Sequence, residues 1–134
     1  MTDGTPSTYG TQRKAAARNR VAIIEAAHEL FESGIEAEVI DPRTTSPLDT
    51  ETILESVENT GRLVIVDEAS PRCNLATDIS ALVAKEGFGS LRAPIEMVTP
   101  PHTPVPFSDA LEDLYVPGPQ QVVNAAKAVV GWTR

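Results

Sequence analysis

Four side chains of types used in catalysis lie after one apolar run of the sequence. Asp67 and Glu68 follow the run Leu63–Val66 directly, and Cys73 comes soon after them. His102 lies farther along, in a proline-rich stretch. A cysteine and a histidine can act as nucleophile and base, and neighbouring carboxylates can bind a metal. One hypothesis is therefore a self-sufficient small α/β enzyme that uses these four residues.

The sequence around these residues argues against that chemistry. No glycine-rich elbow flanks Cys73, and its spacing from His102 matches no thiol-enzyme signature. No further ligand stands at a diagnostic metal spacing from Asp67 and Glu68, and no glycine-rich phosphate loop is present. Acids at such a place more often cap the next helix or bind a neighbouring arginine, here Arg72. The residues alone predict an α/β domain without its own active site.

The apolar run predicts the element that positions these side chains. Leu63–Val66 is four apolar residues in succession, mostly β-branched, which is typical of a parallel strand covered on both faces. Ligands and partners of open α/β sheets usually bind at the carboxyl ends of the strands. We therefore expect any function near residues 67–73, or in loops that close over them.

Helices and strands alternate along the rest of the chain. Apolar periodicity predicts helices over residues 12–33, 49–59, 74–86 and from 118 onward. Shorter strands are expected at 35–41 and 95–98. The run Val21–Ile24 lies within the helical pattern, but it could also form a strand, because β-branched residues suit strands. The alternation predicts a three-layer α/β/α sandwich with a mostly parallel sheet.

Composition narrows the class of protein. A chain of 134 residues is long enough for one domain with its own core, and 41% of its residues are hydrophobic. No apolar run approaches the roughly 20 residues that span a bilayer, and the N-terminus has no signal-peptide pattern. A single cysteine, Cys73, cannot form an internal disulfide. We expect a cytoplasmic protein that does not bind membranes.

The charge is distributed unevenly. Residues 1–20 carry four basic residues against Asp3, a balance of +3, and read as a disordered or atypical leader. Residues 21–134, the expected domain, hold seven basic and eighteen acidic residues, a balance of −11. An acidic body argues against nucleic acid as a partner and suits a partner with a basic face. The alternative is that the acids only keep the surface solvated.

Several blocks of sequence resemble a known family. Gly34–Thr44, Ser46–Asp49 and Thr60–Ala69 are similar to the transketolase C-terminal domain that ends the β subunits of thiamine-diphosphate-dependent 2-oxo acid dehydrogenases. Finer blocks resemble the acetoin dehydrogenase branch of that family; they are Asp67–Cys73, Ala93–Ile95, Pro101–Phe107 and Leu111–Tyr115.

The resemblance implies a role inside a larger enzyme. The parent would be a decarboxylating heterotetramer that uses thiamine diphosphate and Mg²⁺. It would act on acetoin or, alternatively, on pyruvate or a branched-chain 2-oxo acid, and pass the acyl group to a lipoyl-acyltransferase. This domain would serve assembly with the α subunit and a second β subunit, and docking of the acyltransferase core. It would bind no cofactor and be inactive alone, because no catalytic residue of the family transfers to it.

Two departures from the family pattern affect folding. The larger N-terminal domain of the β subunits has no counterpart here, and the apolar strand that opens the family's C-terminal domain is missing or altered. That strand is central in the family's sheet. Its loss would leave the Leu63–Val66 strand or its neighbour with an unpaired edge. We therefore predict self-association, as a dimer, unless Val21–Ile24 supplies a replacement strand.

Five residues are candidates for partner binding. His102, in a stiff loop beyond a strand, is the best polar candidate, although a hydrogen-bonded loop histidine is the simpler interpretation. The other four are acids near or within the proline-rich region, namely Glu96, Asp109, Glu112 and Asp113. Lipoyl-acyltransferase docking modules of related complexes are small and basic, so these acids are a candidate docking patch. Solvated loop charges are the alternative interpretation.

Overall fold

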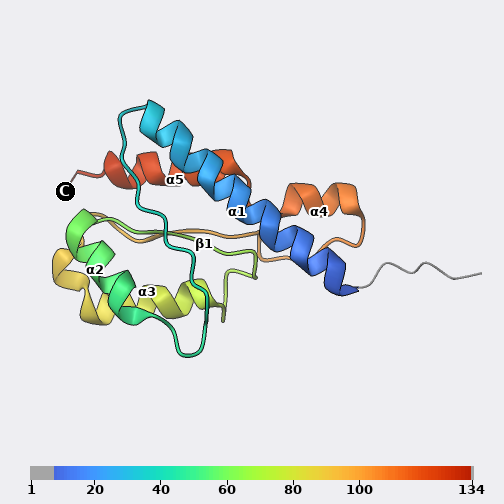
Figure 1. Cartoon of the computed structure of the whole chain (residues 1–134), viewed down its shortest axis with the longest axis horizontal. Helices are drawn as coiled ribbons and strands as arrows, with labels where there is room; N and C mark the ends of the chain where they lie inside the picture. The colour runs from blue at the N-terminus through green and yellow to red at the C-terminus, as the bar shows by residue number, and fades with distance from the viewer. Residues whose placement is uncertain (1–7, 134) are drawn as a thin grey trace, which may run out of the picture.

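Two short parallel strands lie among five α-helices in the computed structural model (Figure 1). The structure describes the backbone of residues 8–133, and the side chains from residue 20 onward except that of Asp109. The elements in order are α1 (Thr8–Glu32), α2 (Thr50–Thr60), β1 (Val64–Val66), α3 (Leu75–Glu86), the 3₁₀ turn η1 (Phe88–Ser90), β2 (Glu96–Val98), α4 (Asp109–Tyr115) and α5 (Pro119–Val130).

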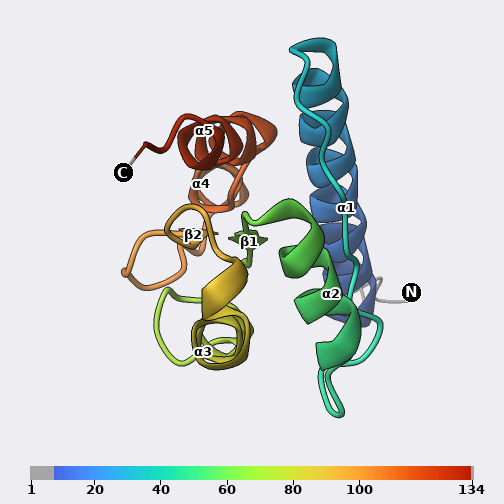
Figure 2. The same ribbon diagram turned by 90° about the vertical axis from the view of Figure 1, so that its left-hand side faces the viewer.

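The two strands form a parallel ladder in which Ile65 lies opposite Met97. The N–H of Glu96 donates to the C=O of Leu63 at 3.1 Å, and the N–H of Asp67 donates to the C=O of Val98 at 3.1 Å. Because backbone groups of successive residues point to opposite edges, those of Val64 and Val66 face away from β2. Figure 2 shows β2 on one side of β1 and helices α1 and α2 on the other.

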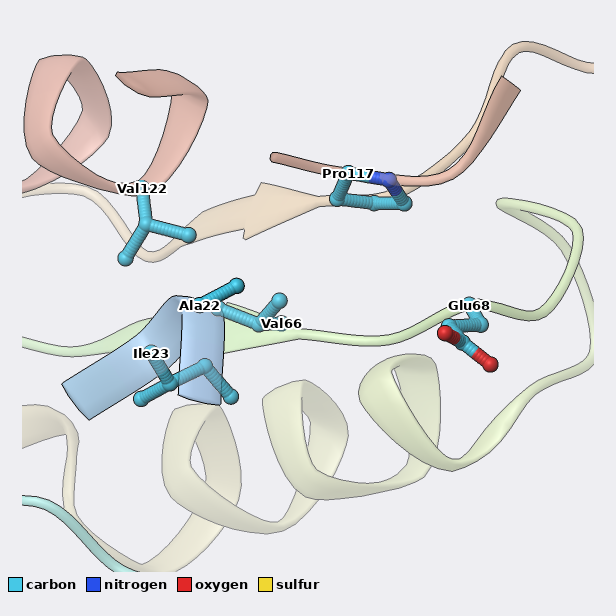
Figure 3. Close-up of a pocket in the computed structure, with 6 residues that line it drawn as sticks. All are labelled: Ala22, Ile23, Val66, Glu68, Pro117 and Val122. Atoms are coloured by element: carbon cyan, nitrogen blue, oxygen red, sulfur yellow. The ribbon is translucent and has the colours of Figure 1, made fainter. Parts of the chain in front are cut away.

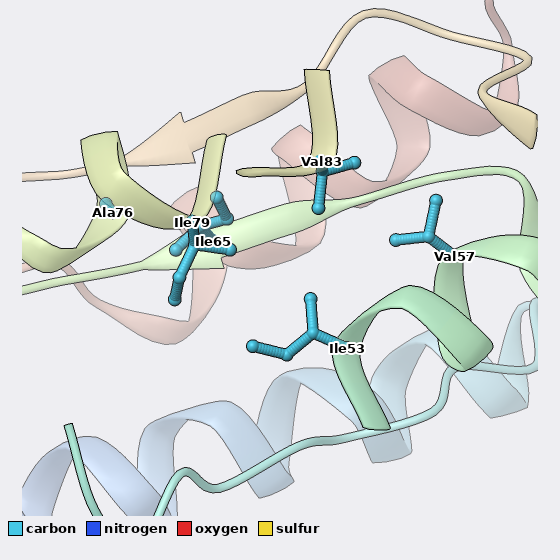
Figure 4. Close-up of a cluster of buried hydrophobic side chains, with 6 residues drawn as sticks. All are labelled: Ile53, Val57, Ile65, Ala76, Ile79 and Val83. Atoms are coloured by element: carbon cyan, nitrogen blue, oxygen red, sulfur yellow. The ribbon is translucent and has the colours of Figure 1, made fainter. Parts of the chain in front are cut away.

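Helices cover both faces of this small sheet, and each face has its own apolar cluster. On one face Ile65 packs with residues of α2 and α3 (Figure 4), namely Ile53, Val57, Ala76, Ile79 and Val83. On the other face Val98 packs with residues of α1 and α5, namely Ala26, Leu30, Val122 and Val123. Val64 and Val66 pack against this second cluster, since alternate residues of a strand point to opposite faces.

Helices α2 and α3 begin at side-chain caps. The Asp49 carboxylate accepts hydrogen bonds from the Thr52 N–H at 3.1 Å and the Thr52 hydroxyl at 2.8 Å, which starts α2. Asn74 and Thr77 form a capping box at the start of α3. Gly61, with φ of 71°, ends α2 in the left-handed conformation that glycine adopts without strain. The predicted helices over 49–59 and 74–86 are confirmed.

The strand predicted at residues 35–41 is wrong. No residue from 35 to 43 is in a strand, and the only backbone–backbone hydrogen bond in this segment joins the Ile35 N–H to the Leu30 C=O at 2.9 Å. The alternation of apolar and acidic residues is present, yet no described strand lies beside it to pair with. The sheet of the described residues therefore has two strands, parallel as expected, rather than a larger number.

Helix α1 resolves the ambiguity at Val21–Ile24 and reaches into the expected leader. Val21–Ile24 is helical and so does not replace a strand. Residues 8–20 of the expected leader belong to the same helix, while residues 1–7 lie outside the described part of the chain. The boundary between leader and domain stays a prediction. None of the described helices has the length and apolar character needed to cross a membrane.

Candidate functional site

The loops that follow β1 and β2 meet at the carboxyl edge of the sheet. The Ser70 hydroxyl and the Nδ1 atom of His102, from these two loops, are 3.1 Å apart. The carboxyl ends of parallel strands share one edge, so residues distant in sequence come together there. The loop after β2 thus contacts the segment 67–73 where we expect any function, and the candidate site is this edge.

The carboxylate of Asp67 is used by the backbone around it. One oxygen accepts from the Ala69 N–H at 2.9 Å, and the other accepts from the Ala76 N–H at 3.2 Å in the first turn of α3. An acid at a helix N-terminus also complements the helix dipole. The interpretation of Asp67 as a helix-capping acid is therefore confirmed.

The second acid, Glu68, lies beside apolar side chains of three elements. Figure 3 shows it at one end of a cluster formed with α1, β1 and the start of α5, whose other members are Ala22, Ile23, Val66, Pro117 and Val122. Its Oε1 atom is buried and has no hydrogen-bond partner among the described residues. These neighbours offer neither a proton to accept nor further metal ligands. Glu68 thus has no catalytic partner at this edge.

Cys73 and His102 do not form a nucleophile and base. Cys73 is exposed, with a positive φ of 54°, and His102 is exposed on the other loop. No hydrogen bond or ion pair joins any two of the four candidates Asp67, Glu68, Cys73 and His102. The structure pairs His102 with Ser70 instead, and no third described residue orients the imidazole from its Nε2 side. A nucleophile activated by a base needs such an orienting group.

The Ser70–His102 contact therefore connects two loops, and a second contact fixes the same region. The Tyr115 hydroxyl, from the last turn of α4, donates to the Thr103 C=O at 3.2 Å, and the Thr103 N–H donates to the Pro101 C=O at 2.8 Å. Sequence reasoning missed Ser70 and Tyr115 as partners. The position of Ser70 just beyond a strand end was the only signal available for it.

The acidic candidates are divided between the two ends of β2. Glu112 is half-buried and Asp113 exposed in α4, whose first residue is Asp109. The side chain of Asp109 lies outside the described residues. Glu96 is exposed at the amino end of β2, whereas α4 follows the loop that leaves its carboxyl end. The structure therefore brings Glu112 and Asp113 onto one helix but places Glu96 apart from them in the fold.

The described residues do not fit thiamine diphosphate with Mg²⁺. Magnesium binds through carboxylate oxygens and substrate phosphates, yet both oxygens of Asp67 are engaged with backbone N–H groups. Across residues 20–108 and 110–133, no three His, Cys, Asp or Glu side chains gather to hold a metal. An open groove of about 360 Å³ lies at the amino end of β2 and is lined mainly by apolar groups.

Comparison with known proteins identifies the family of this chain. Residues 15–122 match the family described as the transketolase C-terminal domain. The acetoin:2,6-dichlorophenolindophenol oxidoreductase β subunit of Cupriavidus necator is 68% identical over 104 residues, which are 78% of this chain and 31% of that protein. The protein of the same name in Bacillus subtilis is 57% identical over 108 residues, 81% of this chain and 32% of that one.

More distant relatives point in the same direction. The pyruvate dehydrogenase E1 component β subunit of Rhizobium meliloti is 43% identical over 106 residues, covering 79% of this chain and 23% of that protein. The chain thus spans about a third or less of the curated relatives named here. A solved structure described as a split gene transketolase, inactive β4 tetramer, superimposes with a TM-score of 0.70 and 27% identity, covering 85% of this chain and 36% of that one. The chain belongs to the transketolase C-terminal domain family.

Proposed function

We propose that this chain is the C-terminal part of the β subunit of an acetoin dehydrogenase, acting in subunit assembly and inactive alone. The observation that carries the proposal is 68% identity over a segment that makes up 31% of an acetoin oxidoreductase β subunit. The lower identity of 43% to a pyruvate dehydrogenase β subunit favours acetoin over pyruvate as the parent's substrate. The polar residues of the carboxyl edge, which serve backbone capping and loop contacts, support the absence of an active site here.

Exposed apolar side chains around α4 support the assembly role. Val105 and Phe107 precede this helix, Leu111 and Leu114 lie on it, and all four are exposed. Exposed apolar side chains that form a patch are typical of protein–protein contacts, and these four lie within ten residues of sequence. The partners in the proposal are the α subunit, a second β subunit and the lipoyl-acyltransferase core, in a heterotetrameric parent.

The predicted three-layer sandwich needs a larger sheet than the two described strands form, and we propose that the assembled enzyme contains it. Among the described residues no strand pairs with the outward backbone groups of Val64 and Val66, so a further parallel strand can add at this edge of β1. A two-stranded sheet with three residues in each strand is at the lower limit of the usual size of a sheet. We infer that a further strand at this edge completes the domain in the assembled enzyme.

Calorimetric titration of the chain with thiamine diphosphate and Mg²⁺ tests the claim that it is inactive alone. We expect no heat beyond dilution, because the described residues offer no diphosphate cradle and no metal ligand set. The intact parent enzyme, titrated in parallel, is the positive control. Saturable binding of the cofactor by the isolated chain, with one site per molecule, would contradict the proposal.

The docking patch is proposed to lie on α4, with Glu112 and Asp113 as its centre, and the same helix begins at Asp109. His102 remains a candidate in the preceding loop, and Glu96 remains a separate candidate at the amino end of β2. Complementary charge mainly raises the association rate and makes it depend on salt. In the intact heterotetramer, changing both Glu112 and Asp113 to Ala should slow association with the acyltransferase docking module at low salt and reduce the salt dependence. The matched control changes Glu55 and Glu58, two exposed acids of α2, to Ala. Equal rates in wild type and both double variants would exclude α4 as the dock.

A further inference from the structure

An aromatic groove lies at the amino end of the strands, away from the candidate site. Phe88 of η1 and Trp132, just beyond α5, line it together with Arg92, Pro94 and other residues before β2. Phe88 is 70% exposed and Trp132 is 49% exposed, so both rings present faces to solvent. Open grooves lined by aromatic rings are the surfaces that bind proline-rich peptides, whose backbone is already extended and loses little entropy on binding.

This chain also carries a segment with the properties of such a peptide. Pro104–Phe107 has two prolines, and none of its four residues takes part in a backbone–backbone hydrogen bond. The preceding loop is fixed by the contacts of His102 with Ser70 and of Thr103 with Tyr115. Val105 is 65% exposed and Phe107 is fully exposed. The segment is therefore stiff, anchored and directed outward.

The groove and the segment lie at opposite ends of the same strand. Ile95, which lines the groove, comes directly before β2, and Thr99 directly follows it. Figure 1 shows the C-terminal end of α5 at one end of the long axis and α4, which follows the proline segment, at the other. The two surfaces cannot meet within one molecule.

We propose that the groove around Phe88 and Trp132 binds the Pro104–Phe107 segment of a second copy of this chain. One turn of polyproline II helix, three residues and about 9 Å long, would lie against the two rings. Arg92 at the groove would then approach α4 of the second copy, which follows the segment and carries Glu112. The contact joins different surfaces of the two copies, so it builds chains or closed rings rather than a twofold dimer.

Trp132 is the only tryptophan of the chain and therefore reports on the groove directly. The probe is a synthetic peptide with the sequence of residues 99–108, titrated into the full chain at a low protein concentration while tryptophan fluorescence is recorded. We expect a saturable change in Trp132 emission. A peptide with Pro104 and Pro106 both replaced by Ala should bind at least tenfold more weakly, because it loses the preformed extended backbone.

Two exposed phenylalanines provide a matched pair of protein variants. Phe88→Ala should weaken peptide binding at least tenfold, whereas Phe31→Ala on α1, where the ring is 64% exposed, should leave it unchanged. Substitutions of exposed side chains rarely unfold a protein, and the far-ultraviolet circular dichroism of both variants checks this. The absence of a saturable fluorescence change at millimolar peptide would overturn the proposal, as would equal binding of the two peptides or equal loss in the two variants. The result of the peptide titration does not depend on the result of the cofactor titration, so each experiment can refute its own proposal without affecting the other.

Discussion

Asp49 shows how single polar side chains of this chain serve the backbone. Hydrogen bonds from the Thr52 hydroxyl, and then from the Thr52 N–H, hold the pKa of Asp49 below its ordinary value of 3.8. The native state therefore binds this proton less readily than the unfolded state does. The resulting stability is fully present above the unfolded pKa and is lost as the pH falls through the lower, folded pKa.

The predicted consequence is a change in acid sensitivity when this pair is altered. Thr52→Ala removes the stronger of the two hydrogen bonds, so the pKa of Asp49 should return toward its ordinary value and the protein should lose less stability on acidification. Asp49→Asn keeps an acceptor for the helix start but removes the titrating group, and should have a similar effect. Urea unfolding at a series of pH values between about 2 and 6 measures both. An unchanged acid slope in both variants would refute the linkage.

For single residues, the sequence indicates where helices begin and end, but not which side chains contact each other across the fold. The ends of α2 and α3 agree with the predicted ranges to within a residue, because a cap such as Asp49 or Asn74 needs only a residue type at one place along a helix pattern. The Ser70–His102 contact joins residues 32 positions apart, and nothing in either local sequence indicates the other. Of the two interpretations offered for Asp67, contact with the next helix is the one observed, because the Asp67 carboxylate accepts a hydrogen bond from the Ala76 N–H.

At the scale of elements, two glycines end helices in the same left-handed conformation but in different surroundings. Gly34 has φ of 79° and nothing within 4 Å of the position that a Cβ atom would take. Gly61 has φ of 71°, and a Cβ there would lie 2.8 Å from the Cγ and Cδ atoms of Arg92. The Arg92 N–H also donates to the Gly61 C=O at 2.8 Å, which holds the two backbones together.

These two sites separate backbone strain from steric conflict. Gly34→Ala should destabilise the fold by about 1 kcal/mol, the cost of a left-handed backbone for a residue with a Cβ atom. Gly61→Ala should cost more, because the Arg92 side chain must also move. In the background of Arg92→Ala the difference between the two glycine variants should shrink, and chemical denaturation of the four variants measures it. Equal costs at both sites in the wild-type background would show that the conflict is absent.

Residues 35–41 show why one element could not be predicted. The alternation there indicates a strand, but a strand also needs a neighbour that satisfies its backbone, and a local pattern does not reveal whether the neighbour exists. Strand β1 was predicted correctly because its apolar run is long enough to be buried on both faces. The two central helices were located correctly because their apolar faces and caps agree.

At the scale of the whole molecule, the free edge of β1 carries a prediction about assembly. The N–H groups of Val64 and Val66 point away from β2, and Val21–Ile24 is helical and gives them no strand partner. We expect the chain to self-associate, and sedimentation velocity over a range of concentrations should show its mass increase. If strands pair at this edge, amide exchange at Val64 and Val66 should slow as concentration rises. A monomer at all concentrations would contradict the prediction.

Amide exchange also distinguishes this contact from the groove contact. Binding of the proline segment in the groove leaves the edge of β1 unpaired, so Phe88→Ala should lower the mass at high concentration without changing exchange at Val64 and Val66.

The overall fold class could be predicted from the alternation of patterns along the chain. The extent of the sheet could not, because a local pattern does not show which segments pair as strands.

The segment between α1 and α2 is a site where a protease could cut the chain. Within the described part of the chain residues 36–43 make no backbone–backbone hydrogen bond, and the Arg43 side chain is 75% exposed, so a protease that cuts after arginine has ready access there. A single cut would release α1 from the covalent chain but not from the fold. Ala26 and Leu30 would still pack on α5, and Glu29 would still lie 3.9 Å from Lys127. Helix α1 and the chain from α2 onward should therefore bind each other without a covalent link. The two could be produced as separate polypeptides and recombined.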